Sequence, residues 1–239
     1  MDKVLEGLVT RLRGSAGPNL RSIVLYGSAA SGEFHSAHSD LNILCLLYRV
    51  NSPELSKLHK AAAWFVRRGH PMPLVFTFEE LRSAADLYAI ELLEIKTHRR
   101  VLYGEDLFTS IDVPMALHRF QVERELRYQS IRLRQGYIAV AGKNKAVLAL
   151  TIRSASSFAL LFRHALMVLG ETPSSSRREA VDHLGALLGF DTSGFKVVFE
   201  LRDKSQSQEK PDYAQVFEKY SGAVTQAVNA IDRKFEELK

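Results

Sequence analysis

The sequence has 239 residues, of which 46% are hydrophobic and 25% charged. This ordinary balance excludes wholesale disorder, a collagen-like repeat and a small disulfide scaffold. The 32 Lys and Arg residues exceed the 27 Asp and Glu residues by five. The resulting isoelectric point near 9.3 weakly favours anionic partners such as nucleotides, while nucleic acid remains an unsupported alternative.

Features that would indicate export or membrane insertion are missing from the sequence. Cys45 is the single cysteine, so no intrachain disulfide can form. The first residues carry two acids and lack a continuous apolar core, unlike a signal peptide. The longest apolar stretch, 155–169, is interrupted by Arg163 and His164. We therefore expect a cytoplasmic protein with no membrane partner.

The first half of the chain is predicted to mix helices and strands. Helical spacing of apolar residues predicts a helix over 2–13, and short apolar runs predict strands at 23–26 and 41–47. The small and polar stretch between these strands, 27–39, is not expected in the core. The remaining predicted elements are a helix from an N-cap at Ser52 to about Gly69, a strand at 74–76, a helix at 79–97 and a strand at 100–103.

The second half is predicted to be an all-α bundle. Its expected helices are 116–141, 145–169, one capped by Ser176 that ends at Leu188, 193–201, and one from Pro211 to near the C-terminus. The helix at 145–169 is apolar on all sides, so we expect it at the centre of the bundle. Its expected core residues are Leu150, Phe158, Leu161 and Leu166. The change of character near residue 110 predicts two domains, 1–108 and 109–239.

The motif most indicative of chemistry lies around the stretch between the first two predicted strands. It consists of Leu25-Tyr26-Gly27-Ser28, eleven further residues, and then Asp40-Leu41-Asn42. Gly27 allows the backbone to approach a phosphate closely, and Ser28 offers a hydroxyl and an N–H group. Since residues two apart on a strand face the same side, Asp40 and Asn42 are expected to project from one face of the sheet.

This arrangement resembles the nucleotidyltransferase superfamily, which includes DNA polymerase β, the antibiotic nucleotidyltransferases and the minimal nucleotidyltransferases. The resemblance covers roughly residues 20–108. It implies an α+β fold, in which a mixed β-sheet with flanking helices precedes an all-α helical bundle. It also implies Mg²⁺ as cofactor and a nucleoside triphosphate as ligand, bound near Gly27, Ser28 and Ser39. Asp40 would ligate the metal, and Asp40 and Asn42 would occupy the catalytic positions.

The sequence departs from the superfamily pattern at two carboxylates. Asn42 stands where the second acid is expected, and its neutral amide is a poorer Mg²⁺ ligand. The third acid is missing from the predicted strand around 73–78, and Glu79 and Glu80 follow in what should be the first turn of a helix. We therefore expect a nucleotide-binding protein with weak or lost nucleotidyl transfer.

Other hypotheses remain open at this point. One is an active Mg²⁺-dependent nucleotidyltransferase that modifies a small molecule or a protein. Another is a non-catalytic interaction module, either a toxin–antitoxin partner or a homodimeric scaffold. Gly27 and Ser28 could also form a plain strand-to-helix turn with Ser28 as N-cap. Asp40 could then simply cap its own backbone.

Two pairs of residues suggest weaker functional hypotheses. His35 and His38 could touch a phosphate or a metal, although two loop histidines without a further ligand are usually solvated. Arg178 and His183, with four residues between them, resemble the Arg–His motif of the helical HEPN ribonucleases. The abundance of Arg in this chain makes such a pair expected by chance.

The basic residues of the helical half are a candidate binding surface. Arg132, Arg134, Lys143 and Lys145 could form a basic face, but Glu123 and Glu125 dilute the charge, so a solvated surface is favoured. Arg163 lies on the apolar helix together with Arg153 and His164. We expect Arg163 to extend its guanidinium to the surface, the alternative being a cleft that meets an anionic ligand.

Overall fold

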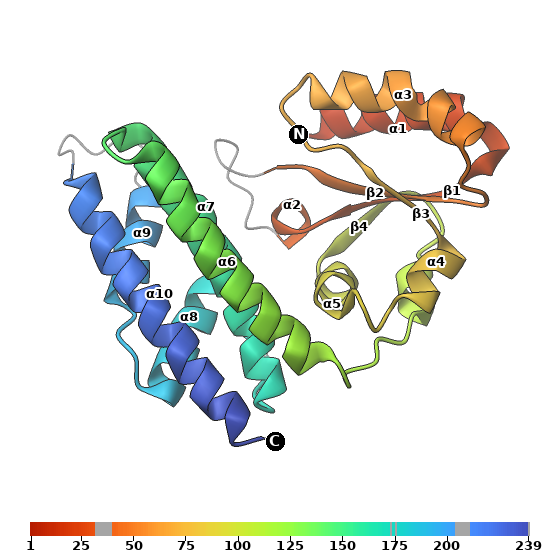
Figure 1. Ribbon diagram of the computed structural model, residues 1–239. Coiled ribbons are helices and arrows are strands. Elements are labelled where there is room, and N and C mark those ends of the chain that lie inside the picture. Colours follow the sequence, from red (N-terminus) through yellow and green to blue (C-terminus); the bar gives the residue numbers. More distant parts are fainter. Residues whose placement is uncertain (32–39, 173, 175, 204–210, 239) are drawn as a thin grey trace. The chain divides into compact units, whose positions relative to one another are not determined.

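The computed structural model describes residues 1–31, 40–172, 174, 176–203 and 211–238 (Figure 1). It divides into two compact units, Met1–Leu117 and His118–Lys239. Each unit has its own core and is described separately below. The assignment of 1–108 to a nucleotidyltransferase-like domain and of 109–239 to a helical domain stays a prediction.

The first unit contains a mixed four-stranded sheet in the order β3-β2-β1-β4. The strands are β1 Leu20–Tyr26, β2 Asn42–Leu47, β3 Leu74–Thr77 and β4 Arg99–Gly104. β1 is antiparallel to both β2 and β4, whereas β2 and β3 are parallel. The parallel pair requires a crossover, which α3 (Ser52–Val66) supplies. The predicted α+β fold with a mixed sheet is confirmed.

Helices cover both faces of this sheet (Figure 1). On one face, α1 (Asp2–Ala16) and α3 pack over a cluster that includes Ile43 and Cys45. On the other face, α4 (Phe78–Ser83) and α5 (Ala89–Thr97) pack over a cluster that includes Leu44 and Leu46. Successive residues of β2 therefore alternate between the two faces, which fixes the side on which each of its side chains lies.

Three local predictions for this unit need correction. Asn51, not Ser52, caps α3, because its Oδ1 accepts a 3.0 Å hydrogen bond from the Glu54 N–H. The single helix predicted at 79–97 is two helices, α4 and α5, whose break at 84–88 lets both pack against the sheet. The stretch 27–39 does contribute to the core, since Ala29 in the short helix α2 (Ser28–Ser31) is buried.

The second unit is a bundle of helices around α7. The helices are α6 His118–Val140, α7 Asn144–Val168, α8 Arg177–Leu188, α9 Ser193–Asp203 and α10 Tyr213–Glu236. α7 contacts each of the other four. Phe158, Leu161 and Leu166 are buried as predicted. Leu150 is only partly buried, and Arg163 is 5% exposed rather than extended to the surface.

α7 is a long and mostly apolar helix. By length and composition it is the one helix in the described part of the chain that could cross a membrane. The central helix of a bundle passes the same test, and α7 buries Arg163 and His164 together with its apolar residues. Its apolar character is thus accounted for by packing within the bundle.

A histidine pair is buried where α6 begins. His118 Nε2 lies 2.9 Å from His164 Nδ1, and the two rings meet edge to face. His118 is 1% exposed. Burial, reinforced by the neighbouring His164, lowers the pKa of His118 to about 4. At neutral pH His118 is therefore uncharged.

Candidate functional site

Gly27 forms the turn at the end of β1. The strand ends at Tyr26, Gly27 has φ 78°, and the chain then enters α2. The Ala30 N–H donates a 2.9 Å hydrogen bond to the Gly27 carbonyl. A Cβ atom at Gly27 would lie 3.1 Å from Asn42 Nδ2. The positive φ and the close approach of Asn42 both favour glycine here.

Asn42 lies opposite Tyr26 in the β1–β2 ladder. By the alternation of β2, Asn42 shares a side with Leu44, the side covered by α4 and α5. Asp40 is exposed and precedes the strand by two residues. Because it lies outside the regular strand, alternation does not fix its direction. The shared face of Asp40 and Asn42 therefore stays a prediction.

His35, His38 and Ser39 lie outside the described residues. The backbone of Ser28 directly follows Gly27 as the first residue of α2. The proposed roles of Ser28 and Ser39 at a phosphate stay predictions.

His70 is a neighbour of Asp40 that the motif does not indicate. Its ring packs at 4.7 Å from the Phe65 ring, between α3 and β3. Burial lowers the pKa of His70, and the negative charge of Asp40 partly opposes this shift. The sequence gives no signal for this proximity, because thirty residues separate the two side chains.

Glu91 is a second residue that the motif does not indicate. It lies in the first turn of α5 and is exposed. Burial raises the pKa of the Tyr26 hydroxyl, and the charge of Glu91 raises it further. Since Tyr26 pairs with Asn42 across the ladder, Glu91 places a carboxylate near this end of the sheet.

Glu79 and Glu80 lie at the wrong end of the sheet to complete the motif. They follow β3, whose last residue, Thr77, lies beside Leu47 at the far end of β2 from Asn42. A strand of this length spans about 17 Å. Neither glutamate can therefore join Asn42 in one metal site.

Both glutamates have structural roles instead. Glu80 and Thr77 form a reciprocal capping box, with hydrogen bonds of 2.6 and 3.1 Å that begin α4. Glu79 pairs with Arg21 at 3.8 Å. The sequence-based interpretation of these acids as the first turn of a helix is confirmed.

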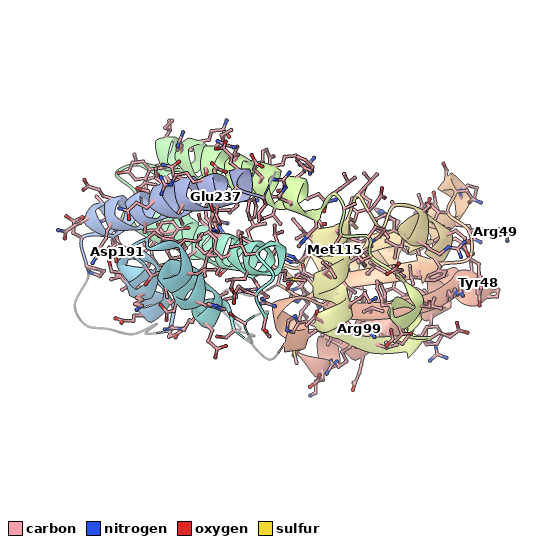
Figure 2. The ribbon with its side chains drawn as sticks, turned by 90° about the horizontal axis from the view of Figure 1, so that it is seen from below. Tyr48, Arg49, Arg99, Met115, Asp191 and Glu237 are labelled. Atoms are coloured by element: carbon pink, nitrogen blue, oxygen red, sulfur yellow. The ribbon has the colours of Figure 1, made fainter. Side chains whose placement is uncertain are left out.

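Two arginines lie at the turn end of the sheet. Arg99, labelled in Figure 2, pairs with Tyr26 in the β1–β4 ladder and forms a 2.7 Å ion pair with Asp106. Arg100 forms a 3.3 Å ion pair with Asp2. Both guanidiniums thus have carboxylate partners. In Figure 2, Arg99 lies well away from Tyr48, which follows the other end of β2.

No family model and no curated protein matches the sequence. Among solved structures, the chain is similar to spectinomycin adenyltransferase AAD(9) from Enterococcus faecialis, determined with ATP and spectinomycin. The TM-score is 0.60 at 12% identity, and the match covers 97% of this chain and 99% of the other. The chain has the fold of a nucleotidyltransferase. A toxin–antitoxin structure with AMP-PNP also matches, at 22% identity over 53% of this chain and 98% of that one, but its TM-score of 0.34 supports no argument.

In active members of a nucleotidyltransferase fold, catalysis would use Mg²⁺ held by several carboxylates. The described residues contain no group of three or more His, Cys, Asp or Glu side chains arranged to hold a metal. At the Gly27 turn, the candidate ligands are Asp40 and the neutral Asn42. This set does not fit a two-metal centre, because Mg²⁺ depends on carboxylate and phosphate oxygens to replace its hydration shell.

The ribonuclease-like spacing on α8 does not assemble a site. Arg178 pairs with Asp203 and lies over the Phe199 ring. His183 lies 3.3 Å from Glu171. Five positions along a helix turn the two side chains well apart, and each contacts a different partner. The spacing of Arg178 and His183 is therefore explained by separate surface ion pairs.

Proposed function

We propose that this protein binds a nucleoside triphosphate at the Gly27 end of its sheet and transfers nucleotidyl groups weakly or not at all. The observation that carries the proposal is the similarity over 97% of the chain to an adenyltransferase determined with ATP. The geometry at Gly27 supports it. Gly27, which has no side chain, forms the turn after the central strand β1 and lies beside the polar side chain of Asn42.

The chemistry of Asn42 suits binding without efficient transfer. A triphosphate carries several negative charges, and each carboxylate beside it must be offset by a metal or a basic group. Asn42 removes one such carboxylate and offers an amide that can both donate and accept hydrogen bonds. A nucleotide can then bind with less dependence on divalent ions, while the charge needed to hold those ions for catalysis is reduced.

A second candidate is an active nucleotidyltransferase, and Glu91 is the observation that favours it. Its carboxylate acts on Tyr26, the ladder partner of Asn42. In this alternative, Glu91 supplies the acid that β3 lacks. It requires turnover that depends on both Asp40 and Glu91.

Nucleotide binding is tested by calorimetric titration of ATP into the full chain and two glycine variants. Gly27→Ala and Gly170→Ala each place a side chain at a residue with φ 78°, so both strain the backbone. A Cβ at Gly170 meets nothing within 4 Å, and Gly170 follows α7 in the other unit. We expect Gly27→Ala to weaken ATP binding at least tenfold and Gly170→Ala to leave it unchanged. Absence of saturable binding by the natural protein, or equal weakening by the two variants, would contradict the proposal.

A further inference from the structure

A long basic segment of the helical unit contains no acidic residue. Between Glu125 and Glu171 the sequence has no Asp or Glu, although the chain contains 27 of them. This segment covers most of α6 and all of α7. The basic residues in it are Arg127, Arg132, Arg134, Lys143, Lys145, Arg153 and Arg163. The acids expected to dilute this charge, Glu123 and Glu125, both precede it.

α6 and α7 form a hairpin, and residues of both helices line a groove on its surface. The helices lie side by side (Figure 1), joined through a turn at Gly142. They approach each other closely at Gly136, where a Cβ atom would lie 2.7 Å from Leu150. Beside this contact lies a groove of about 630 Å³. Its polar lining residues include Tyr128, Gln129, Arg132, Gln135, Arg153 and Ser157.

The two arginines of the groove have no acidic partner in the described part of the chain. Among the described residues, no carboxylate forms an ion pair with Arg132 or Arg153. Arg132 contacts Tyr128, with 3.3 Å between Nη1 and the hydroxyl. By contrast, Arg127 on the same helix pairs with Asp232 at 2.8 Å. Two positive charges on adjacent helices are thus available to a ligand in one groove.

The hydroxyl of Ser154 in the groove is hydrogen-bonded to a residue of the bundle core. Ser154, which also lines the groove, lies 2.8 Å from the hydroxyl of Tyr220 on α10. Tyr220 is fully buried, and burial raises its pKa well above the ordinary value, so its hydroxyl keeps its proton. When the Tyr220 hydroxyl donates a hydrogen bond to the Ser154 oxygen, the Ser154 O–H group is available to donate a hydrogen bond to a ligand.

We propose that the α6–α7 groove binds a phosphate-bearing small molecule. Arg132 and Arg153 hold the phosphate, because guanidinium groups present paired donors that match its oxygens. The amide and hydroxyl groups of Gln129, Gln135 and Ser157 contact the polar body of the ligand. The size of the groove is typical of a small-molecule site. All its lining residues belong to the helical unit.

The test is an NMR titration of the full chain with inorganic phosphate, glucose 6-phosphate and uncharged glucose. Variants Arg132→Gln and Arg153→Gln each remove one groove cation. Arg134→Gln is the matched control, because Arg134 is exposed on the same helix but lines different pockets, on the α10 side. We expect glucose 6-phosphate to shift signals from the groove residues, and glucose to shift none. Either groove variant should weaken binding at least tenfold, whereas the control should change it less than twofold.

Two results with the phosphate compounds, and one with RNA, would overturn the proposal. One is that neither phosphate compound shifts groove signals in the natural protein. The other is equal weakening by all three variants, which indicates diffuse attraction to a basic surface. A single-stranded RNA oligomer that binds more tightly than glucose 6-phosphate, with equal losses in the three variants, would assign the surface to nucleic acid instead. Circular dichroism of each variant checks that the bundle remains folded.

Discussion

The two proposed anion sites, the Gly27 turn and the α6–α7 groove, rest on different physical features. At the turn, the main-chain conformation of Gly27 and the neutral Asn42 are the principal features, and Arg99 and Arg100 are occupied by carboxylates. In the groove, the principal features are Arg132 and Arg153, which form no ion pair with a carboxylate of the described residues. The first site depends on backbone geometry within one short segment. The second depends on two helices that bring distant residues together.

The two ends of the sheet differ in a related way. Glu79 and Glu80 are paired or capping groups at one end, whereas Asp40, Asn42 and Glu91 lie toward the other. Proximity in sequence to a strand does not place an acid at the correct end of that strand. The proposal of weak transfer rests on this placement as much as on the replacement of a carboxylate by Asn42.

The largest expected effect concerns the stability of the helical bundle. Phe158 is fully buried on α7, so Phe158→Ala should destabilise the bundle by about 3–5 kcal/mol through lost burial and a residual cavity. Phe120 on α6 is 54% exposed, and Phe120→Ala should change stability by less than about 0.5 kcal/mol. Urea denaturation followed by circular dichroism measures both. Similar effects of the two substitutions would contradict the central position of α7.

The next effect is the pH dependence of the same bundle. The pKa of His118 is about 4 in the folded protein, below its ordinary value of 6.5. Between these values the unfolded chain binds more protons, so stability falls as the pH drops from 6.5 toward 4. The loss attributable to His118 should be on the order of 2–3 kcal/mol. Urea denaturation at pH 7 and pH 4.5 should show a smaller pH-dependent loss for His118→Gln. The same pH dependence in His118→Gln and the natural protein would show that titration of His118 does not affect the stability of the bundle.

A smaller effect is expected from restoring a carboxylate at the turn. Asn42→Asp should strengthen Mg²⁺ binding by about tenfold, equivalent to roughly 1.4 kcal/mol, because it adds a charged oxygen ligand. It should not produce efficient transfer, because Glu79 and Glu80 remain at the far end of the sheet. Metal titration beside a pyrophosphate-release assay measures both properties. Asn229→Asp in α10 adds the same charge elsewhere, and an equal gain there would indicate that no metal site is assembled at the turn.

The smallest expected effect concerns Glu91. Glu91→Gln removes a negative charge that raises the pKa of Tyr26, so this pKa should fall. It should stay above the ordinary value of 10.0, because burial is the larger cause. A titration of tyrosine absorbance, compared with that of Tyr26→Phe, isolates the Tyr26 signal. An unchanged Tyr26 pKa would mean that Glu91 is too distant to act at this end of the sheet.

The fold was largely predictable because its signals are local. Apolar runs located the strands, and glycines together with N-cap residues located most helix ends. The break between α4 and α5 was missed, because apolar residues continue at helical spacing across 84–88. The N-cap was assigned one residue late, since both Asn51 and Ser52 are favourable caps and only geometry selects between them.

The candidate site was less predictable, because its composition depends on contacts between distant segments. The motif located Gly27 and Asn42, which the structure places side by side. It gave no indication of His70 or Glu91, whose proximity arises from the packing of α3 and α5. The groove had one visible signal, the absence of acids between Glu125 and Glu171. The sequence alone does not show that Arg132 and Arg153 line the same groove, because the α6–α7 hairpin brings them together.

The central claim is nucleotide binding without efficient transfer, and a single assay with labelled ATP and Mg²⁺ tests it most directly. The natural protein should bind ATP saturably, with at least tenfold weaker binding in Gly27→Ala, and should release pyrophosphate no faster than Asp40→Asn. Rapid pyrophosphate release that is lost in both Asp40→Asn and Glu91→Gln would contradict this account and establish an active nucleotidyltransferase.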